Sequence, residues 1–590
     1  MGINKMRAIF PQRITERLQN RTMFKVWLIL VIFVFSLHAF GSFSRFSEIS
    51  FKILDLRSIL AADIVLLFIG IAAFAGQSKT ANRVLALSLV AFVMEICLSY
   101  HLATRNGIWG FDAVLDFGAT ERISSEGWKG VGAYSQLFAT YDFPALSFLA
   151  SSARLTSSIP LESLFAIVPI SLAIIAVVAL LSLLKRVLPI RNAMLATLVF
   201  VMYPALFGGL YLLQTIGTSL LVVALLSLLV SRRGLSSKNR GELVVAILLM
   251  SLLIGHVLEP YTLLLLAVYG LFYVALRQGS KLDDEHSAVL DDRLGVPPLL
   301  IPRILSIFIV ITVTGYWLFF NPSMLERLGG AIVQLYEQQP LGRQIHSIDA
   351  GSAYSIFLDV GEHILMLAFL GAGMIGLLIG KANLDRRLSN FLLFPMVIVA
   401  STEFLVLFRS LHIQIARLFL WAWLFLIGYA FAHIDRGLLR GSFWKILLVL
   451  LVVWFYGASC STEVFNGYHR YNYERMEYKP YLLDSEIQAA RWFNVTDEAI
   501  VGDQGAWHLL TAFTSAHVVV DIDAIDRGPD GIMAFDWFFF RYENLNLAFD
   551  AYSQNSTSIS LEELAAIDHS GGIERVFDNG GAAIYRLVSS

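Results

Sequence analysis

Residues 161–184, LESLFAIVPISLAIIAVVALLSLL, show the feature that decides the fold of this chain. The segment is apolar over the roughly 17–25 residues that an α-helix needs to cross a bilayer. Twelve other segments have the same character: 24–43, 59–76, 84–100, 192–213, 215–231, 243–258, 260–276, 303–320, 357–380, 389–408, 413–433 and 443–459. The sequence therefore predicts a mainly α, polytopic membrane helical bundle of about thirteen spans.

The composition agrees with this class. Of the 590 residues, 57% are hydrophobic and 15% are charged, and the mean hydropathy is +0.66. A soluble globular domain has about 25% charged residues, so a cytosolic enzyme and a disordered chain are excluded. The two cysteines, Cys97 and Cys460, are too few for a secreted disulfide scaffold or a cysteine-based metal site. The formal net charge of −2 gives no indication of nucleic acid, and we expect no such partner.

Basic residues predict the orientation of the chain in the membrane. Lys and Arg prefer the cytoplasmic side, and six of them precede or open the first span: Lys5, Arg7, Arg13, Arg17, Arg21 and Lys25. With the N-terminus inside, six consecutive inside loops are basic, from the loop of Lys79 to the loop of Lys445. We therefore expect a multi-pass protein of the cell (plasma) membrane with a cytoplasmic N-terminus. Its long extracytoplasmic segments are then 101–160, 321–356 and the C-terminal tail.

The tail has a different character from the rest of the chain, because it lacks long apolar runs. Its patterns are helical at Ser485–Phe493 and Leu561–Ile567, strand-like at Ala499–Val501 and His517–Val520, and hairpin-like at Ile573–Phe577 and Ala583–Leu587 around Asn579-Gly580-Gly581. We predict a transmembrane domain over 1–460 and a small extracytoplasmic α/β domain over 461–590. The glycosylation sequons at Asn494 and Asn555 would lie on the same side of the membrane.

Ionisable residues in the predicted spans lie near the outer ends. Such a residue costs about 2.5–3.5 kcal/mol at the bilayer centre on insertion scales, so each one requires a reason. They are His38, Asp63, Glu95, His256, Glu259, Glu362, His363, Glu403, Arg409 and Arg417. Snorkelling to the interface would explain any one of them, but it would apply equally to both ends of the helices. The one-sided distribution predicts an outward-facing polar cavity, roofed by the long loops and the tail.

The outer loop after the third predicted span contains the strongest candidate site. It holds Asp112, Asp116 and Glu121 in the stretch FDAVLDFGATER, residues 111–122. A helix here would place Asp112 and Asp116 one turn apart on one face, and the apolar residues between them would make it amphipathic. Paired carboxylates can act as a general base toward an acceptor hydroxyl or hold a divalent cation such as Mg or Mn. The alternative is a solvated amphipathic helix.

Cationic residues form the complementary part of the predicted cavity. Arg409, His412 and Arg417 lie at the outer ends of the eleventh and twelfth spans, and Arg343 lies in the outer loop 321–356. Guanidinium groups bind phosphate oxygens bidentately, so these residues are candidates for binding a lipid phosphate. Anchoring at the membrane interface is the alternative for any one Arg.

His256 and Glu259 flank a tight outer turn before Pro260. His256 is either a donor to phosphate or a residue that caps the turn, and the sequence favours neither role.

These residues resemble the pattern of the GT-C superfamily of membrane glycosyltransferases, which take a sugar from a polyprenyl-phosphate carrier on the outer face. The pattern is a span, an outer loop with an acidic residue, an interface helix, and a proline-containing lead into the next span. Here it corresponds to Phe111-Asp112 through Glu121-Arg122, followed by Tyr141-Asp142-Phe143-Pro144.

The chain also resembles a group of archaeal multi-pass proteins of unassigned function within that superfamily. The matching places are Leu213–Gly217, Gly255–Tyr261, Phe540–Asn544 and Val576–Arg586. Thirteen spans and an outer C-terminal domain are also the architecture of single-subunit oligosaccharyltransferases. Their Trp-Trp-Asp-Tyr-Gly signature is missing from this sequence, so monosaccharide or glycan-building transfer is expected rather than recognition of a peptide sequon.

The resemblance implies an inverting transfer of a sugar from a polyprenyl (dolichyl) phosphate to a glycan or protein acceptor. Asp112 would be the base or the acceptor-orienting carboxylate, with Asp116 and Glu121 as supports or metal ligands. Arg409 and Arg417 would neutralise the departing lipid phosphate. Two other readings remain open. A lipid-linked-sugar flippase would have ionisable groups near the midplane, and a non-catalytic envelope assembly protein could share the scaffold.

Overall fold

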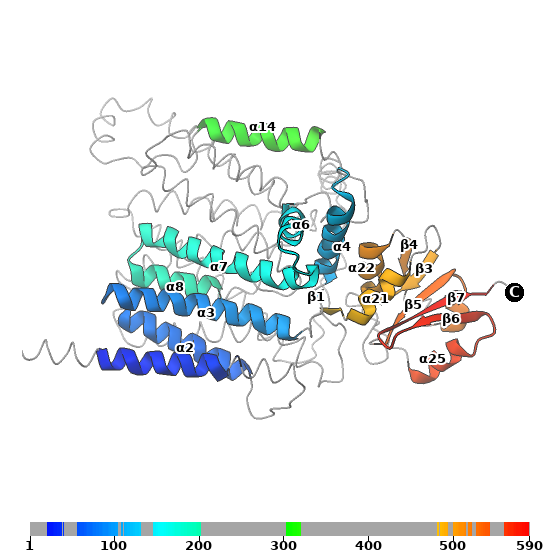
Figure 1. The fold of residues 1–590 in the computed structure, drawn as a ribbon, viewed down its shortest axis with the longest axis horizontal. Coiled ribbons are helices and arrows are strands. Elements are labelled where there is room, and N and C mark those ends of the chain that lie inside the picture. The colour runs from blue at the N-terminus through cyan, green and yellow to red at the C-terminus, as the bar shows by residue number, and fades with distance from the viewer. Residues whose placement is uncertain are drawn as a thin grey trace, which may run out of the picture.

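The computed structural model describes residues 21–37, 39, 56–103, 108–109, 111–130, 145–201, 303–319, 481–482, 484–493, 499–514, 517–521, 527–542 and 560–588. These residues form two regions, a set of long apolar helices and a C-terminal α/β unit that lies at one end of them (Figure 1). Short helices of the loop after α3 lie between the two regions.

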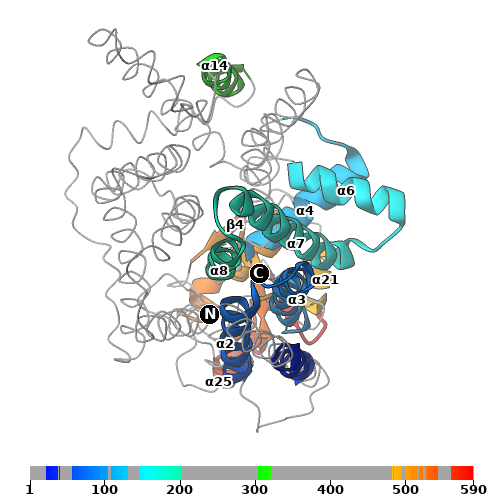
Figure 2. The same ribbon diagram turned by 90° about the vertical axis from the view of Figure 1, so that its left-hand side faces the viewer.

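Six of the predicted spans coincide with apolar helices. These are a helix at 21–37, α2 (Leu56–Phe74), α3 (Lys79–Ala103), α7 (Leu161–Val187), α8 (Ile190–Val201) and α14 (Arg303–Phe319). Helices α2, α3, α7 and α8 pack side by side, and α14 lies apart from them in both views (Figures 1 and 2). The other seven predicted spans lie outside the described residues.

Within the described residues, one stretch, Leu161–Ser182 of α7, has both the length and the apolar composition needed to cross a membrane. Shorter apolar helical stretches are found at Ala62–Phe74, Ile190–Val201 and Ile307–Phe319. The number of thirteen spans and their orientation therefore stay predictions.

The apolar helices bury one side and expose another that is equally apolar. On α7, Ala176 and Leu180 are buried, whereas Ile175 is 51% exposed. On α14, Ile311 is 65% exposed and Phe319 is 81% exposed. A water-soluble helix would carry polar residues on such a face, so the exposed faces are suited to contact with lipid.

Two helices lie across the ends of this bundle. Helix α4 (Phe111–Glu126) and helix α6 (Ala145–Ser157) pack against each other, and both run in a different direction from α3 and α7 (Figure 1). Helix α6 then leads through Pro160 into α7. Residues 111–126 and 145–157 of the loop after α3 are thus helical, and the first of these stretches includes the helix considered from the sequence at residues 111–122.

The C-terminal α/β unit is built on a five-stranded sheet of order β4-β3-β5-β7-β6. Its strands are β3 (Ala499–Gly502), β4 (His517–Val520), β5 (Trp537–Arg541), β6 (Ile573–Asp578) and β7 (Ala582–Leu587). Strand β3 is parallel to β4 and β5, whereas β7 is antiparallel to β5 and β6. Its helices are α21 (Asp484–Trp492), α22 (Gln504–Phe513), α24 (Pro529–Ile532) and α25 (Leu561–Asp568).

Most of the predicted elements of the tail are confirmed. The two helices correspond to α21 and α25, the two strands to β3 and β4, and the hairpin to β6 and β7. The hairpin turns at Gly580, whose φ of +78° favours glycine. Helix α22 and the central strand β5 were not predicted.

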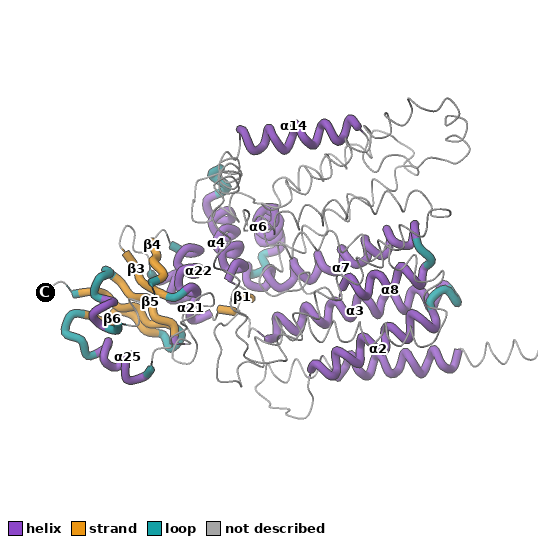
Figure 3. Tube along the Cα trace, turned by 180° about the vertical axis from the view of Figure 1, so that it is seen from behind, coloured by secondary structure: helices purple, strands orange, loops and turns teal. Residues whose placement is uncertain are grey.

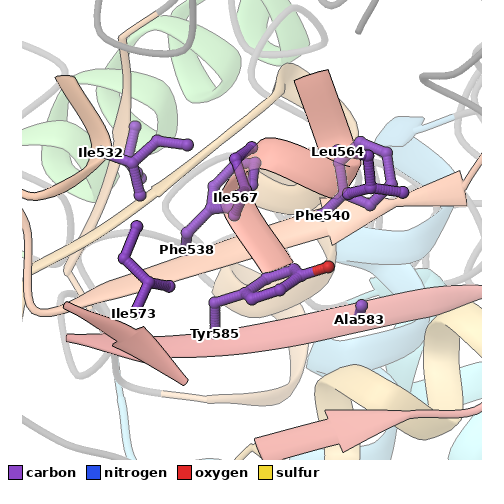
Figure 4. Packing of buried hydrophobic residues seen from close by; sticks show 9 residues of the cluster. Ile532, Phe538, Phe540, Leu564, Ile567, Ile573, Ala583 and Tyr585 are labelled. Atoms are coloured by element: carbon purple, nitrogen blue, oxygen red, sulfur yellow. The ribbon is translucent and has the colours of Figure 1, made fainter. Parts of the chain in front are cut away.

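The core of the unit lies on both faces of β5, whose five residues are all buried. On one face, Phe538 and Phe540 pack with Ile567 of α25 and Tyr585 of β7 (Figure 4). On the other face, Trp537 contacts Phe493 at the end of α21, with ring centroids 5.0 Å apart. Helix α25 therefore covers one face of the sheet, while α21 and α22 cover the other.

Candidate active site

A two-stranded ladder joins the loop after α3 to the start of the C-terminal unit. Strand β1 (Ile108–Trp109) pairs antiparallel with β2 (Tyr481–Leu482), and Trp109 lies opposite Tyr481. Helix α4 begins two residues after β1, and α21 begins two residues after β2. The same ladder therefore fixes where both helices start.

Helix α4 carries the predicted carboxylates. Asp112 lies in its first turn and Asp116 one turn later, so the helical spacing places both on one face. The side chain of Asp116 is buried, with 6% exposure. Its backbone carbonyl accepts a hydrogen bond from Thr120 Oγ1 at 2.7 Å.

The middle of α4 departs from the amphipathic pattern that the sequence predicted. Every residue from 114 to 120 is buried, including Asp116 and Thr120. The reason is that α4 is enclosed by partners from distant parts of the chain, namely α22, α6 and α7. Figure 3 shows α21 and α22 between the sheet and α4. The stretch from 114 to 120 is therefore not a solvated face, whereas residues 121–126, apart from Ile123, are partly or fully exposed.

The contact between α4 and α22 is very close at one point. A Cβ on Gly118 would lie 2.4 Å from the carbonyl oxygen of Ala512 and 2.7 Å from its Cβ. Beside this point, Phe117 contacts Phe513 of α22 and Phe165 of α7, with centroid distances of 5.8 Å and 5.2 Å. Only glycine allows the backbones to approach in this way.

Arg122 binds the C-terminal end of α22. Its Nη2 donates to the carbonyl oxygen of Thr514 at 2.8 Å, and its Nε donates to that of Ala512 at 3.4 Å. The last carbonyls of a helix have no partner within the helix, and a cation there also interacts favourably with the helix dipole. Arg122 thus joins α4 to α22 through backbone atoms.

Arg491, in the last turn of α21, joins three helices. Its Nη2 lies 3.0 Å from Glu121 of α4 and 3.7 Å from Glu162 in the first turn of α7. Its guanidinium carbon lies 5.6 Å from the ring centroid of Phe117 and 5.2 Å from that of Phe513. The side chains of Arg491 and Glu121 are 38% and 34% exposed, and ion pairs of this kind contribute at most about 1 kcal/mol. These ion pairs therefore fix the positions of the helices relative to one another more than they stabilise the fold.

The three predicted carboxylates thus lie on one helix, although Glu121 is paired with Arg491. The predicted phosphate-binding residues lie outside the described residues: His256, Glu259, Arg343, Arg409, His412 and Arg417. In the described part of the chain, no group of three or more His, Cys, Asp or Glu side chains is placed to hold a metal ion.

The sequence analysis missed a buried ion trio in the C-terminal unit. Arg541, at the end of β5, donates from Nε to Glu486 at 2.9 Å and from Nη1 to Asp503 at 2.7 Å. The side chains of the three residues are at most 4% exposed. Asp503 is also the N-cap of α22, since it accepts from the backbone N–H of Ala506. The signal in the sequence was an arginine at the end of a run of aromatic residues.

This trio occupies the place where α/β sheets commonly bind ligands. Strands β3 and β5 are parallel neighbours, and the chain leaves β3 toward β4 on the opposite side. Ligands commonly bind at the carboxyl ends of strands at such a reversal. Here the guanidinium of Arg541 fills the space, because a Cβ on Gly505 would lie 1.9 Å from its Nη1. The reversal point is thus filled by the protein's own charges.

Two tyrosines of the unit have perturbed acidity. Burial raises the pKa of Tyr585, and nearby Asp568 raises it further. Burial also raises the pKa of Tyr542, whose hydroxyl donates to Asp578 at 2.5 Å. Both shifts keep the phenols neutral, so neither residue is prepared to act as a base near neutral pH.

Comparison with known proteins gives a distant structural likeness. No protein-family model matches the sequence, and no curated protein matches it. The chain is similar to the apo form of the Archaeoglobus fulgidus oligosaccharyltransferase, with a TM-score of 0.46 and 10% identity over 78% of this chain and 70% of that one.

Two further structures of the same Archaeoglobus fulgidus protein are similar. In one, the enzyme is tethered by a disulfide bond to an acceptor peptide containing the NVT sequon, and in the other it is in complex with Zn and sulfate. Both have a TM-score of 0.44 and 12% identity over 78% of this chain and 69% of that one. Identities this low do not allow residue roles to be carried from one chain to the other.

Proposed function

We propose that this protein is a membrane glycosyltransferase of the GT-C type. It transfers a sugar from a polyprenyl-phosphate carrier to an acceptor on the extracytoplasmic face, with inversion. The observation that carries the proposal is helix α4, a carboxylate-bearing helix enclosed between the ends of the apolar helices and the C-terminal α/β unit. A lipid-linked donor would present its sugar at this level of the molecule.

The proposed mechanism uses a carboxylate as the base and arginines as the cations. Asp112 takes the proton from the acceptor hydroxyl as the new bond forms between the acceptor oxygen and the anomeric carbon. The bond from that carbon to the phosphate oxygen breaks, and the lipid phosphate leaves with the electron pair. Arg409 and Arg417 stabilise the charge that develops on the phosphate. Glu121 supports the helix that bears Asp112, and Asp116 lies one turn from Asp112 as a support or a metal ligand.

The remaining predicted residues belong to the same donor site. His412, Arg343, His256 and Glu259 are proposed to contact the phosphate or the sugar of the carrier. Their types fit this task, because guanidinium and imidazolium groups donate to phosphate oxygens and a carboxylate accepts from sugar hydroxyls.

We propose Asp112 and Asp116 as the residues that would hold a divalent cation of the Mg or Mn type. Such ions are held by one or two protein carboxylates together with substrate phosphates, so Asp112 and Asp116 suffice on the protein side. Held there, a cation would supply positive charge to the phosphate as it leaves the sugar, in addition to the arginines that bind the donor. Glu121 is engaged by Arg491 at 3.0 Å, so its contribution is to fix the helix.

The test is consumption of polyprenyl-phosphate sugars by the purified full-length protein, with crude membrane extract as the source of acceptor. A small panel of donors is supplied. Wild type should consume one of them, and so should the control Asp530→Asn, which changes an exposed residue in the first turn of α24. Asp112→Asn should consume none, because Asn cannot accept the proton. Full activity of Asp112→Asn would remove Asp112 from the mechanism. Translocation of lipid-linked sugar in vesicles, without transfer, would show a flippase instead.

A further inference from the structure

Helix α4 is held by the C-terminal α/β unit at three levels. At its start, the β1–β2 ladder fixes Trp109 opposite Tyr481. At its middle, Gly118 lies directly against Ala512 of α22. Toward its end, Arg122 binds the last carbonyls of α22, and Glu121 pairs with Arg491 of α21. All four contacts come from the same unit.

We propose that the C-terminal α/β unit positions the carboxylates of α4 for the reaction, and that Arg122 and Arg491 are its positioning residues. This inference rests on the proposed function, since it assigns Asp112 and Asp116 to the reacting site. Neither arginine touches the substrate in this scheme. Each acts by fixing the helix on which the carboxylates lie.

Arg491 of the C-terminal α/β unit has partners outside that unit. One carboxylate, Glu121, belongs to α4, and the other, Glu162, belongs to the first turn of α7 in the apolar bundle. The guanidinium also lies over Phe117 of α4 and Phe513 of α22. The side chain of Arg491 thus contacts α4 and α7 from the C-terminal α/β unit and fixes their relative positions.

The partners of Arg122 are equally specific. They are backbone carbonyls of Ala512 and Thr514, whose positions are set by α22 itself. Because Ala512 also faces Gly118, the arginine and the glycine hold α4 at one fixed distance from α22. A shift of α22 would therefore move α4.

The close approach at Gly118 allows the displacement caused by Gly118→Ala to be calculated. Ordinary van der Waals contact starts at 3.4 Å, whereas a new Cβ would lie 2.4 Å from the Ala512 oxygen. Gly118→Ala must therefore separate the two helices by about 1 Å, and a displacement of that order can lower a rate about hundredfold. The donor phosphate is proposed to bind cations elsewhere, so its KM should stay unchanged.

The matched control is Gly315→Ala in α14, another glycine within a helix. A Cβ there would meet nothing within 4 Å, while the gain in helix propensity is the same. In full-length protein, Gly118→Ala should lower kcat at least tenfold with the donor KM within about twofold, and Gly315→Ala should change neither. A wild-type kcat for Gly118→Ala would overturn the inference.

The arginines are tested by pairs of variants. Arg491→Ala and Arg122→Ala should lower kcat with little change in the donor KM, and Arg491→Lys should recover part of the loss, because Lys keeps the charge near Glu121 and Glu162. A fall in kcat that merely follows the amount of folded protein would indicate a structural role alone and would contradict the proposal.

Hydrogen exchange separates this inference from the proposed function. In Gly118→Ala and Arg122→Ala, amides of residues 111–126 should exchange faster, while those of β5 and β7 stay protected. Unchanged exchange in α4 would overturn the positioning role even if no sugar donor were found. Faster exchange in α4 together with a wild type that transfers no sugar would refute the proposed function and leave the mechanical coupling intact.

Discussion

Replacing Arg541 by Met should destabilise the C-terminal α/β unit more than any exposed substitution in it. Methionine is a long, apolar side chain without a charge, so the change removes the cation from the buried trio. Glu486 and Asp503 then remain as uncompensated carboxylates, in side-chain positions that are 0% and 4% exposed. Removing one partner of a buried ion pair costs about 3–5 kcal/mol. With a urea dependence of about 2 kcal/mol/M, the midpoint of unfolding should fall by about 2 M.

The assay is pulse proteolysis of the full-length protein in detergent over a urea series, with detection of a C-terminal tag. The matched control is Arg575→Met, because Arg575 is 40% exposed and pairs with Asp578 at 3.1 Å on the surface. An exposed pair contributes at most about 1 kcal/mol, so this variant should shift the midpoint little.

A second variant isolates the electrostatic cause. Adding Glu486→Gln and Asp503→Asn to Arg541→Met removes both buried charges, and Asn still serves as the N-cap of α22. Much of the lost stability should return. If Arg541→Met behaves like Arg575→Met, or if the added neutral residues restore nothing, the reasoning about uncompensated buried charge is refuted.

Three further predictions concern the same unit and are measured by the same unfolding assay. Ser560→Ala removes the capping box of α25 and should cost about 1 kcal/mol; no change would show that the cap is dispensable. Hydrogen bonds from Ser560 lower the pKa of Glu563, so its stabilisation exists above the ordinary pKa of 4.5 and is lost as the pH falls through the lower folded-state value. Glu563→Gln keeps the box and should flatten this acid dependence, whereas an identical pH profile would contradict the assignment. Burial, followed by Asp568, raises the pKa of Tyr585 above 10.0, so stability should fall as the pH rises above that value. Tyr585→Phe should reduce this fall, with the part due to Tyr542 remaining, and an unchanged alkaline profile would contradict the assignment.

The elements that were predicted correctly are those whose signals are local. Helix α25 begins with a Ser560–Glu563 capping box, and the β6–β7 hairpin turns at Asn579-Gly580-Gly581. In both cases the residues that determine the structure are neighbours in the sequence. Strand β5 gives no such signal, because WFFFR is buried on both faces and so lacks the alternation of a half-buried strand.

The candidate site was predictable only in part for the same reason. The sequence offered Asp112, Asp116 and Glu121 as candidates, and the helix that it allowed there is present as α4. It could not show that the helix is enclosed, because the partner of Glu121 is 370 residues away and the farther carbonyl bound by Arg122 is 392 residues away. Every residue has a backbone carbonyl, so the sequence does not indicate which carbonyls of α22 bind Arg122.

The β1–β2 ladder has a consequence for how the protein is made. Residues 108–109 leave the ribosome long before residues 481–482, with which they pair. At about 5–20 residues per second, α4 waits roughly 20–80 s for α22. Chains that terminate before α22 therefore lack the contact between α22 and α4. If sugar transfer needs this contact, as we propose, a nascent chain could not consume the lipid carrier before α22 is made.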